Sequence, residues 1–220
     1  MATETLLTGA ALAPAVLSAV AVIALVACDQ TAFRAGRYLF KPLAAAAFVW
    51  LAWAMGATES PYGCWLLAGL MACMAGDLLL MPEGENTFLA GLVAFLCGHL
   101  LFAIAFLQLP LNFSGLAATA IPAVILLVFA NTWLLPCVAK DMTLPVRAYM
   151  LVITAMLLCA GMTVGQPVST LIILGAWGFA ISDLAVARQQ FVQPSRWNGL
   201  WGTPLYFLSQ MILAVSISQI

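Results

Sequence analysis

The chain has 220 residues, of which 65% are hydrophobic and only 7% are charged, and its formal net charge is −1. Because about a quarter of the residues in a soluble domain are charged, this composition excludes a soluble protein and predicts a single integral membrane domain over residues 1–220. The near-zero charge and the absence of a basic run also leave no electrostatic surface for nucleic acid.

The predicted elements are eight apolar segments, each long enough to cross a hydrocarbon core about 30 Å thick. In chain order they cover residues 6–27, 41–57, 62–81, 87–108, 113–133, 145–163, 167–189 and 199–218. We therefore predict an all-α, polytopic transmembrane helix bundle of about eight spans. The first four residues lack the positive region of a cleaved signal peptide, so we expect the first segment to stay in the protein.

The orientation of the bundle follows from its Lys and Arg residues, because the cytoplasmic connections of membrane proteins are enriched in them. All seven flank the first, fifth and seventh connections: Arg34, Arg37, Lys41, Lys140, Arg147, Arg188 and Arg196. We therefore expect this end in the cytoplasm and both termini on the non-cytoplasmic side. The expected location is the bacterial cytoplasmic, or inner, membrane.

The two halves of the chain carry matching charges. Asp77 and Asp183 each lie near the end of the third segment of a half, and Lys41 and Arg147 each lie 36 residues before them. This spacing is compatible with two parallel four-helix repeats, which favour a site at their interface. Apolar helices of similar length also produce such a match by chance.

The two aspartates are the strongest candidate site residues, because a charge inside hydrocarbon costs several kcal/mol and needs a partner, a proton or a function. Counting along the helices places both at a similar depth near the cytoplasmic end. We expect them to share a pocket with Tyr206 and with the deeper His99, and further polar residues lie near its rim: Asp29, Lys41, Asn131, Arg147, Tyr149 and Asn198. The alternatives are ion pairs with Lys41 or Arg147, a metal site of two Asp and one His, and a proton or ion pathway.

The fourth segment carries an aromatic stripe at helical spacing. Its members follow one another in steps of three or four residues and therefore share one helix face: Phe88, Gly91, Phe95, His99, Phe102 and Phe106. Such a stripe is either core packing or an apolar wall for an acyl chain, with His99 as its one polar point. Small residues in the seventh segment favour close helix contacts that would bring Asp183 into the interior.

These residues resemble the motifs of the YhhN-like lysoplasmalogenases, a family of eight-helix integral membrane hydrolases. The resemblance covers roughly residues 41–215 and rests on motifs in the family's order: Lys41-Pro42, Gly76-Asp77-x-x-Leu80, Phe88-x-x-Gly91-x-x-x-Phe95-x-x-x-His99, Val146-Arg147-x-Tyr149, Gly175-Ala176-x-x-Phe179-x-x-Ser182-Asp183-x-x-x-Ala187 and Tyr206-x-x-x-Gln210. The sequence departs from the family at Leu100-Leu101-Phe102, where a nearby Tyr is expected.

The resemblance implies hydrolysis of the vinyl ether bond of lysoplasmalogens, which are 1-alkenyl-glycerophosphocholines or -ethanolamines, to a fatty aldehyde and glycerophosphocholine or glycerophosphoethanolamine. It implies a lysophospholipid of the membrane as the substrate and no metal or organic cofactor. For this reaction we expect Asp77 and Asp183 as the catalytic pair, and we expect no obligate protein partner. The expected substrate-binding residues are Arg147, Lys41, His99, Tyr206, Phe95, Ser182, Tyr149, Asn131 and Gln210. The alternative function is a proton-coupled or small-solute transporter that uses the same acids.

The chemistry of this reaction fits the two acids independently of the resemblance. A vinyl ether is cleaved by acid, because protonation of its β-carbon gives an oxocarbenium ion that water captures. The reaction needs one carboxylic acid and one carboxylate, and two neighbouring buried carboxyls hold different protonation states. We expect Arg147 rather than Lys41 to bind the phosphate, because a guanidinium binds it through two hydrogen bonds. We expect the tail to run past Phe95 and His99 toward Phe106.

Overall fold

The computed structural model describes residues 9–220, which contain helices and no strand. Seven of the eight long helices in these residues are long and apolar enough to cross a membrane; α2 is not among them, because its first turns carry Arg34, Arg37 and Lys41. The eight are α1 (Gly9–Thr31), α2 (Arg34–Ala54), α3 (Pro61–Leu79), α4 (Glu85–Phe106), α5 (Phe113–Leu134), α6 (Thr143–Gly161), α7 (Ser169–Ala187) and α8 (Arg196–Ser216). The predicted all-α bundle is confirmed, while the expectation about a signal peptide concerns residues outside the described part.

The helix ends differ most from the predicted segments between α1 and α2. We predicted boundaries at residues 27 and 41, whereas α1 continues to Thr31 and α2 begins at Arg34. Hydropathy marks the edge of the membrane, but the hydrogen bonds of a helix continue through polar residues beyond that edge. In the same way α7 continues past Ala187 as a π-helical turn, Arg188–Val192.

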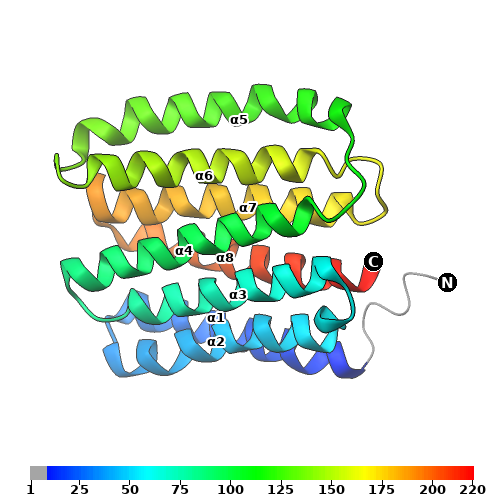
Figure 1. Cartoon of the computed structure of the whole chain (residues 1–220). Helices are drawn as coiled ribbons and strands as arrows, with labels where there is room; N and C mark the ends of the chain where they lie inside the picture. Colours follow the sequence, from blue (N-terminus) through cyan, green and yellow to red (C-terminus); the bar gives the residue numbers. More distant parts are fainter. Residues whose placement is uncertain (1–8) are drawn as a thin grey trace.

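The eight helices run side by side and alternate in direction (Figure 1). Helices adjacent in sequence pack together within α1–α4 and within α5–α8. The two groups meet where α8 packs on α1, α2 and α3, and where α4 packs on α6. The third helix of each group, α3 or α7, is therefore held between its own neighbours close to the other group.

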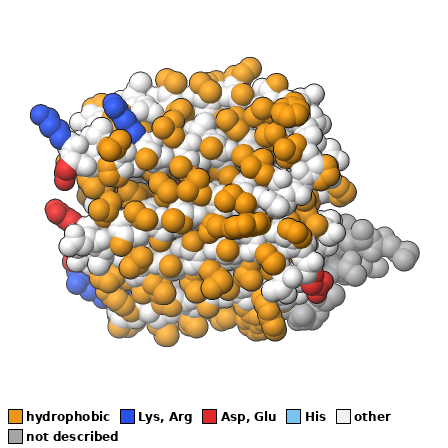
Figure 2. All heavy atoms as spheres, in the orientation of Figure 1, with side chains coloured by type: hydrophobic (Ala, Val, Ile, Leu, Met, Phe, Trp, Pro, Cys, Tyr) orange, Lys and Arg blue, Asp and Glu red, His pale blue; other side chains and the backbone are white. Residues whose placement is uncertain are grey.

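Charged side chains gather at the ends of the bundle, while hydrophobic side chains cover the side in view (Figure 2). Because the helices alternate in direction, all seven Lys and Arg residues fall at the end where α1, α3, α5 and α7 finish, which we call the cationic end. Apolar sides between charged ends are the surface that a bilayer requires. The protein is therefore an integral, multi-pass membrane protein, as the composition predicted.

Candidate active site

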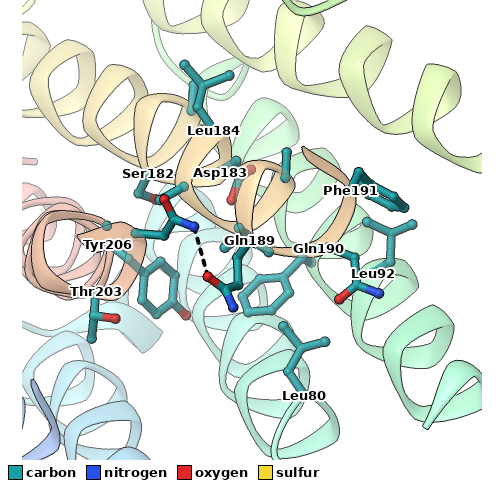
Figure 3. A pocket seen from close by; sticks show the side chains of 18 of the residues that line it. Leu80, Leu92, Ser182, Asp183, Leu184, Gln189, Gln190, Phe191, Thr203 and Tyr206 are labelled. Carbon is teal, nitrogen blue, oxygen red and sulfur yellow. Dashed lines mark hydrogen bonds between the residues drawn. The ribbon is translucent and has the colours of Figure 1, made fainter. Parts of the chain in front are cut away.

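A cavity of about 670 Å³ lies inside the bundle toward the cationic end. All eight long helices contribute to its wall, and no lining residue lies far beyond the midpoint of its helix. Figure 3 shows Asp183 of α7, Tyr206 of α8 and Gln189 of the π-helical turn around one space, together with Leu80 and Leu92. Asp77 also lines this cavity, so both aspartates and Tyr206 share one pocket.

Asp77 is held by groups from two other helices. It lies on α3 and is only 2% exposed. Its Oδ1 is 3.3 Å from Nζ of Lys41 on α2, and its Oδ2 accepts a hydrogen bond of 2.7 Å from the hydroxyl of Tyr206 on α8. A buried carboxylate with an ammonium ion and a hydroxyl as partners is satisfied as an anion. Asp77 is therefore an ion-paired carboxylate, which is the first alternative that the sequence left open.

Asp183 has a different set of partners. It lies on α7, with 14% of its side chain exposed. Its Oδ2 accepts a hydrogen bond of 2.9 Å from the hydroxyl of Tyr149 on α6 and lies 3.3 Å from Nε2 of His99 on α4. No Lys or Arg in residues 9–220 forms an ion pair with this carboxyl. The two aspartates therefore differ in kind of partner, a cation for one and a histidine for the other.

The two ring nitrogens of His99 fix where a proton is held. Nδ1 lies 2.8 Å from the carbonyl oxygen of Phe95, which only accepts hydrogen bonds, so Nδ1 carries a hydrogen. If the ring is neutral and Nδ1 carries its hydrogen, then Nε2 has a lone pair, and this lone pair faces the Asp183 carboxyl. One proton between Nε2 and that carboxyl would give both groups a partner. Nε2 itself makes no hydrogen bond in the described residues, and the Asp183 carboxyl, 3.3 Å away, is the group positioned to share a proton with it.

Aromatic rings hold the two acid groups in place. His99 stacks on Phe179 with 4.1 Å between ring centroids, and Tyr206 packs against Phe179 at 5.5 Å and against Phe95 at 5.8 Å. Phe95 lines the cavity, as does Ser182, whose hydroxyl donates to the Phe179 carbonyl at 2.7 Å. Close packing of this kind restricts rotamer changes. The carboxyls and their partners are therefore fixed in position.

The predicted binding residues divide into those that reach the cavity and those that do not. Arg147 is exposed and lies off the cavity; it is two residues from Tyr149, which lines the wall, so it points roughly 200° away around α6. Asn131 turns back and donates to the carbonyl of Leu127 on its own helix at 3.0 Å. Gln210 is fully buried beyond the cavity, and neither atom of its amide has a hydrogen-bond partner in the described chain.

The remaining predicted residues are near the reacting groups. Lys41, Tyr149, Tyr206, Phe95 and Ser182 all line the cavity. His99 of α4 is fully buried; it lies behind Asp183 and does not line the cavity.

The aromatic stripe of α4 has two parts with different roles. Phe88 and Phe95 line the cavity, whereas Phe102 and Phe106 are fully buried in the core. The predicted tail path toward Phe106 is therefore wrong, because packed side chains fill that space. The apolar part of the cavity instead follows α5 and α6 and is lined by Leu126, Leu127, Ala130, Leu134, Met150 and Ile153.

Sequence reasoning missed the polar turn after α7. Gln189 and Gln190 of this turn line the cavity. Arg188 donates to Oδ1 of Asn198 at 2.6 Å, and Asn198 donates to Oε1 of Gln189 at 2.8 Å, so the turn and the start of α8 form one network. The available signal was the polar run at 188–190 directly after an apolar segment.

A metal site would require several ligands to converge on one point. Within residues 9–220 no group of three or more His, Cys, Asp or Glu side chains is placed to hold a metal ion. The acids instead contact Lys41, Tyr206, Tyr149 and His99. This arrangement can hold one carboxylate and one shared proton in the same cavity.

The sequence model of the YhhN family matches residues 36–217, a range that includes both aspartates and all of their partners. The chain belongs to the YhhN family. The resemblance inferred from the motifs is thereby confirmed over most of the chain. No solved structure significantly matches this YhhN-family protein.

Several relatives of this YhhN-family chain are named lysoplasmalogenases. Lysoplasmalogenase TMEM86B of Sus scrofa is 34% identical over 158 residues, which cover 70% of this chain and 63% of the relative. Lysoplasmalogenase TMEM86B of Homo sapiens is 30% identical over 200 residues, or 86% of this chain and 77% of the relative. A lysoplasmalogenase of Mycobacterium tuberculosis is 31% identical over 134 residues, or 58% and 50%. The matches to the Sus scrofa and Rattus norvegicus proteins span less than two thirds of those relatives.

Proposed function

We propose that this YhhN-family protein is a lysoplasmalogenase, which hydrolyses the vinyl ether bond of a lysoplasmalogen to a fatty aldehyde and glycerophosphocholine or glycerophosphoethanolamine. The names of its relatives support this activity. The cavity supports it as well, since it combines an apolar wall with two aspartates inside a membrane bundle. A lysophospholipid needs both features, because its tail lies in hydrocarbon while the bond to be cleaved lies next to the polar head.

The observation that carries the proposal is the unequal pairing of the two aspartates. Asp77 is paired with the cation of Lys41 and stays a carboxylate. Asp183 lies 3.3 Å from Nε2 of His99, and in our proposal this pair shares a proton that Asp183 gives to the substrate. Two carboxyls whose surroundings fix different protonation states are the arrangement that oxocarbenium chemistry uses in glycosidases. We therefore assign Asp183 as the general acid and Asp77 as the carboxylate that stabilises the cation.

The assignment gives a balanced reaction. The proton of the Asp183 and His99 pair goes to the β-carbon of the vinyl ether and creates an oxocarbenium ion beside Asp77. Water adds to the carbon next to the ether oxygen and passes a proton to Asp77. The product of this addition is a hemiacetal. On collapse, the hemiacetal hydroxyl returns its proton to the Asp183 and His99 pair, and Asp77 protonates the departing glycerol oxygen. One water is consumed, and both acids return to their starting states.

The extent of the cavity favours a hydrolase over a transporter. Its lining residues lie in the half of the bundle nearer the cationic end, and both aspartates lie within four residues of the ends of α3 and α7, whereas transporters bind their substrates near the bilayer midplane. A pocket closed at its inner end suits a lipid that enters, reacts and leaves on one side. We place this end in the cytoplasm by the positive-inside rule, and we propose the bacterial inner membrane as the location.

Aldehyde release from a lysoplasmalogen by the purified protein in detergent tests the proposal. We expect turnover by the wild type without added metal and in the presence of a chelator. Asp77→Asn and Asp183→Asn should each lower kcat by roughly 10²–10⁴-fold, the usual contribution of general acid–base groups, with helix content unchanged by circular dichroism. Asp141→Asn is the matched control, because Asp141 is exposed and lies off the cavity.

The proposal fails if folded wild-type protein releases no aldehyde from either the choline or the ethanolamine substrate. Activity that survives in both aspartate variants would reject the assigned chemistry while leaving the activity standing. Transport of a solute into sealed vesicles, with no hydrolysis in detergent, would instead favour the transporter alternative.

A further inference from the structure

We propose that Arg37 and Arg196 bind the phosphate of the substrate's head group and that Asp29 binds the head group's ammonium. These three residues line the cavity near the cationic end, together with Gln30, and we call this part the outer cavity. The inference rests on the proposed function, because it assigns the polar part of the same lipid. It replaces Arg147, the predicted phosphate ligand, which the structure leaves off the cavity.

Elimination among the seven cations supports this choice. Arg34 forms an ion pair of 2.6 Å with Glu83, and Lys41 is paired with Asp77. Arg188 donates to the side chains of Asn198 and Gln193 at 2.6 and 3.0 Å. The remaining cations off the cavity wall are the exposed Lys140 and Arg147. The two arginines left are the ones that line the outer cavity.

Neither of these two arginines is held by a strong internal partner. Within residues 9–220 Arg196 forms no ion pair, and Arg37 is only loosely paired, with its Nε 3.8 Å from Oδ1 of Asp29. Arg37 keeps 41% of its side chain exposed. Both guanidinium groups are therefore free to take up a phosphate through paired hydrogen bonds.

The backbone brings the three residues to the same place. Arg37 lies four residues before Lys41 on α2, so the two share a helix face, with Arg37 about 6 Å nearer the cationic end. Gln30 at the end of α1 donates from its side chain to the carbonyl of Arg196 at 3.0 Å, which joins the end of α1 to the start of α8. A phosphate in the outer cavity therefore lies about one helical turn from the Lys41 and Asp77 pair. The glycerol backbone of a lysophospholipid spans such a step between phosphate and vinyl ether.

The charges around the cavity match a zwitterion rather than a simple anion. Lys41 and Asp77 are paired with each other, so the outer cavity holds two positive residues, Arg37 and Arg196, and the negative Asp29. A simple anion would gain nothing from the carboxylate of Asp29. A phosphocholine or phosphoethanolamine group carries one charge of each sign, so Asp29 beside Arg37 offers the second contact.

Binding of an uncleavable ligand tests this site without relying on turnover. The probe is a 1-alkyl-lysophosphocholine, a saturated ether that lacks the vinyl bond, measured by calorimetry with the purified protein in detergent. Arg37→Gln with Arg196→Gln should weaken its binding by roughly ten-fold for each arginine, as expected for loss of a charge-assisted hydrogen bond. Arg147→Gln, with the same chemistry at an exposed position, should leave the Kd unchanged. The Arg37→Lys and Arg196→Lys variants keep the charge and should bind at an intermediate level, which also covers the case that the Gln variants do not fold.

Three further ligands separate the contributions of the phosphate, the ammonium and the tail. A 1-alkylglycerol, which has no phosphate, should bind equally to the wild type and to the arginine variants. Asp29→Asn should weaken the binding of the phosphocholine lipid but not the binding of a 1-alkylglycerol phosphate, which lacks the ammonium. Glycerophosphocholine alone should bind less tightly than the lipid, because it lacks the tail. The KM of a cleavable lysoplasmalogen should rise in parallel with the Kd while kcat changes little.

Unchanged Kd values in the folded arginine variants, or a loss of affinity confined to Arg147→Gln, would overturn the assignment. These outcomes differ from a failure of the proposed function. A wild type that releases no aldehyde but binds the alkyl lipid through these arginines would retain the head-group site and lose the hydrolase.

Discussion

At the level of single residues, the protein gives two identical side chains different chemistry through their partners. Burying a carboxylate is costly unless a charge or hydrogen bonds compensate it. The ammonium of Lys41 lies against Asp77, whereas the hydroxyl of Tyr149 and the imidazole of His99 lie against Asp183. His99 does not line the cavity, so it acts on the substrate only through Asp183 and is a positioning residue.

Replacement of this histidine tests its role. His99→Gln removes the group that helps Asp183 to keep a proton, so Asp183 has to take its proton from solution unaided. We expect kcat at neutral pH to fall by roughly 10²-fold, KM to stay unchanged, and the pH–rate profile to move to more acidic pH. Steady-state aldehyde release measured across pH checks all three expectations.

The control for this variant is Gln210→Met. Gln210 is as deeply buried as His99, and its amide has no hydrogen-bond partner in the described chain, so it is bonded to neither aspartate. Its replacement should leave the pH–rate profile where it is. A profile in His99→Gln that only drops in height, with no movement along pH, would reduce His99 to a packing residue.

At the level of helices, rotation about the axis decides which predicted residues reach the site. Spacing in the sequence gave the correct face for the stripe on α4, whose members from Gly91 to Phe106 are buried. Arg147 and Tyr149 could not both face the cavity, since residues two apart on a helix point in nearly opposite directions. Only a partner fixes the rotation of α6, and that partner is Asp183, which accepts the hydrogen bond of Tyr149.

Glycines set how closely α3 and α4 approach beneath the site. A Cβ added at Gly69 would lie 2.5 Å from the ring of Phe102, and one added at Gly98 would lie 2.6 Å from Sγ of Cys73. Both glycines therefore allow a helix contact that a larger residue would prevent. This contact positions the α3 end that carries Asp77 against the α4 face that carries His99.

A pair of glycine substitutions separates this effect from helix propensity. Gly69→Ala should destabilise the protein by about 1–3 kcal/mol, because a fully buried ring has to shift. Gly199→Ala should stabilise it by about 0.5–1 kcal/mol, since it lies within α8 and the nearest atom to an added Cβ is 3.8 Å away. Thermal unfolding in detergent measures both, and equal changes in the two variants would show that α3 and α4 do not pack this tightly.

At the level of the whole molecule, the second, third and fourth helices of the two halves share several packing contacts. Each half pairs its third and fourth helices, and α8 packs on α2 as α4 packs on α6. Each aspartate correspondingly has one partner on the second helix of its own half and one on the fourth helix of the other half. This pattern supports the two parallel repeats that the matched charges suggested, with the cavity at their interface.

The fold was more predictable than the site because the two depend on different information. Segment length and hydropathy suffice for the number of long helices, while the extension of α1 to Thr31 depends on backbone hydrogen bonds that hydropathy does not report. Counting residues along each helix correctly predicted that Asp77, Asp183 and Tyr206 share one cavity. The tail path failed at Phe102, because the sequence does not tell a core ring from one that lines a cavity.

The orientation of the whole molecule in the membrane remains a prediction that labelling tests. All Lys and Arg residues lie at the cationic end, so the positive-inside rule places that end and the cavity in the cytoplasmic half. In a version whose six cysteines are replaced by alanine, we would introduce Thr58→Cys at the opposite end and Asn86→Cys at the cationic end, both at exposed positions. A membrane-impermeant maleimide added to intact cells should label the Thr58→Cys variant, and it should label the Asn86→Cys variant only after the membrane is opened.

The reverse pattern would place the cavity on the outer side, and labelling of both in intact cells would indicate a mixed orientation. Either result would contradict the rule for this protein and would require the lysolipid to reach the aspartates from the outer leaflet.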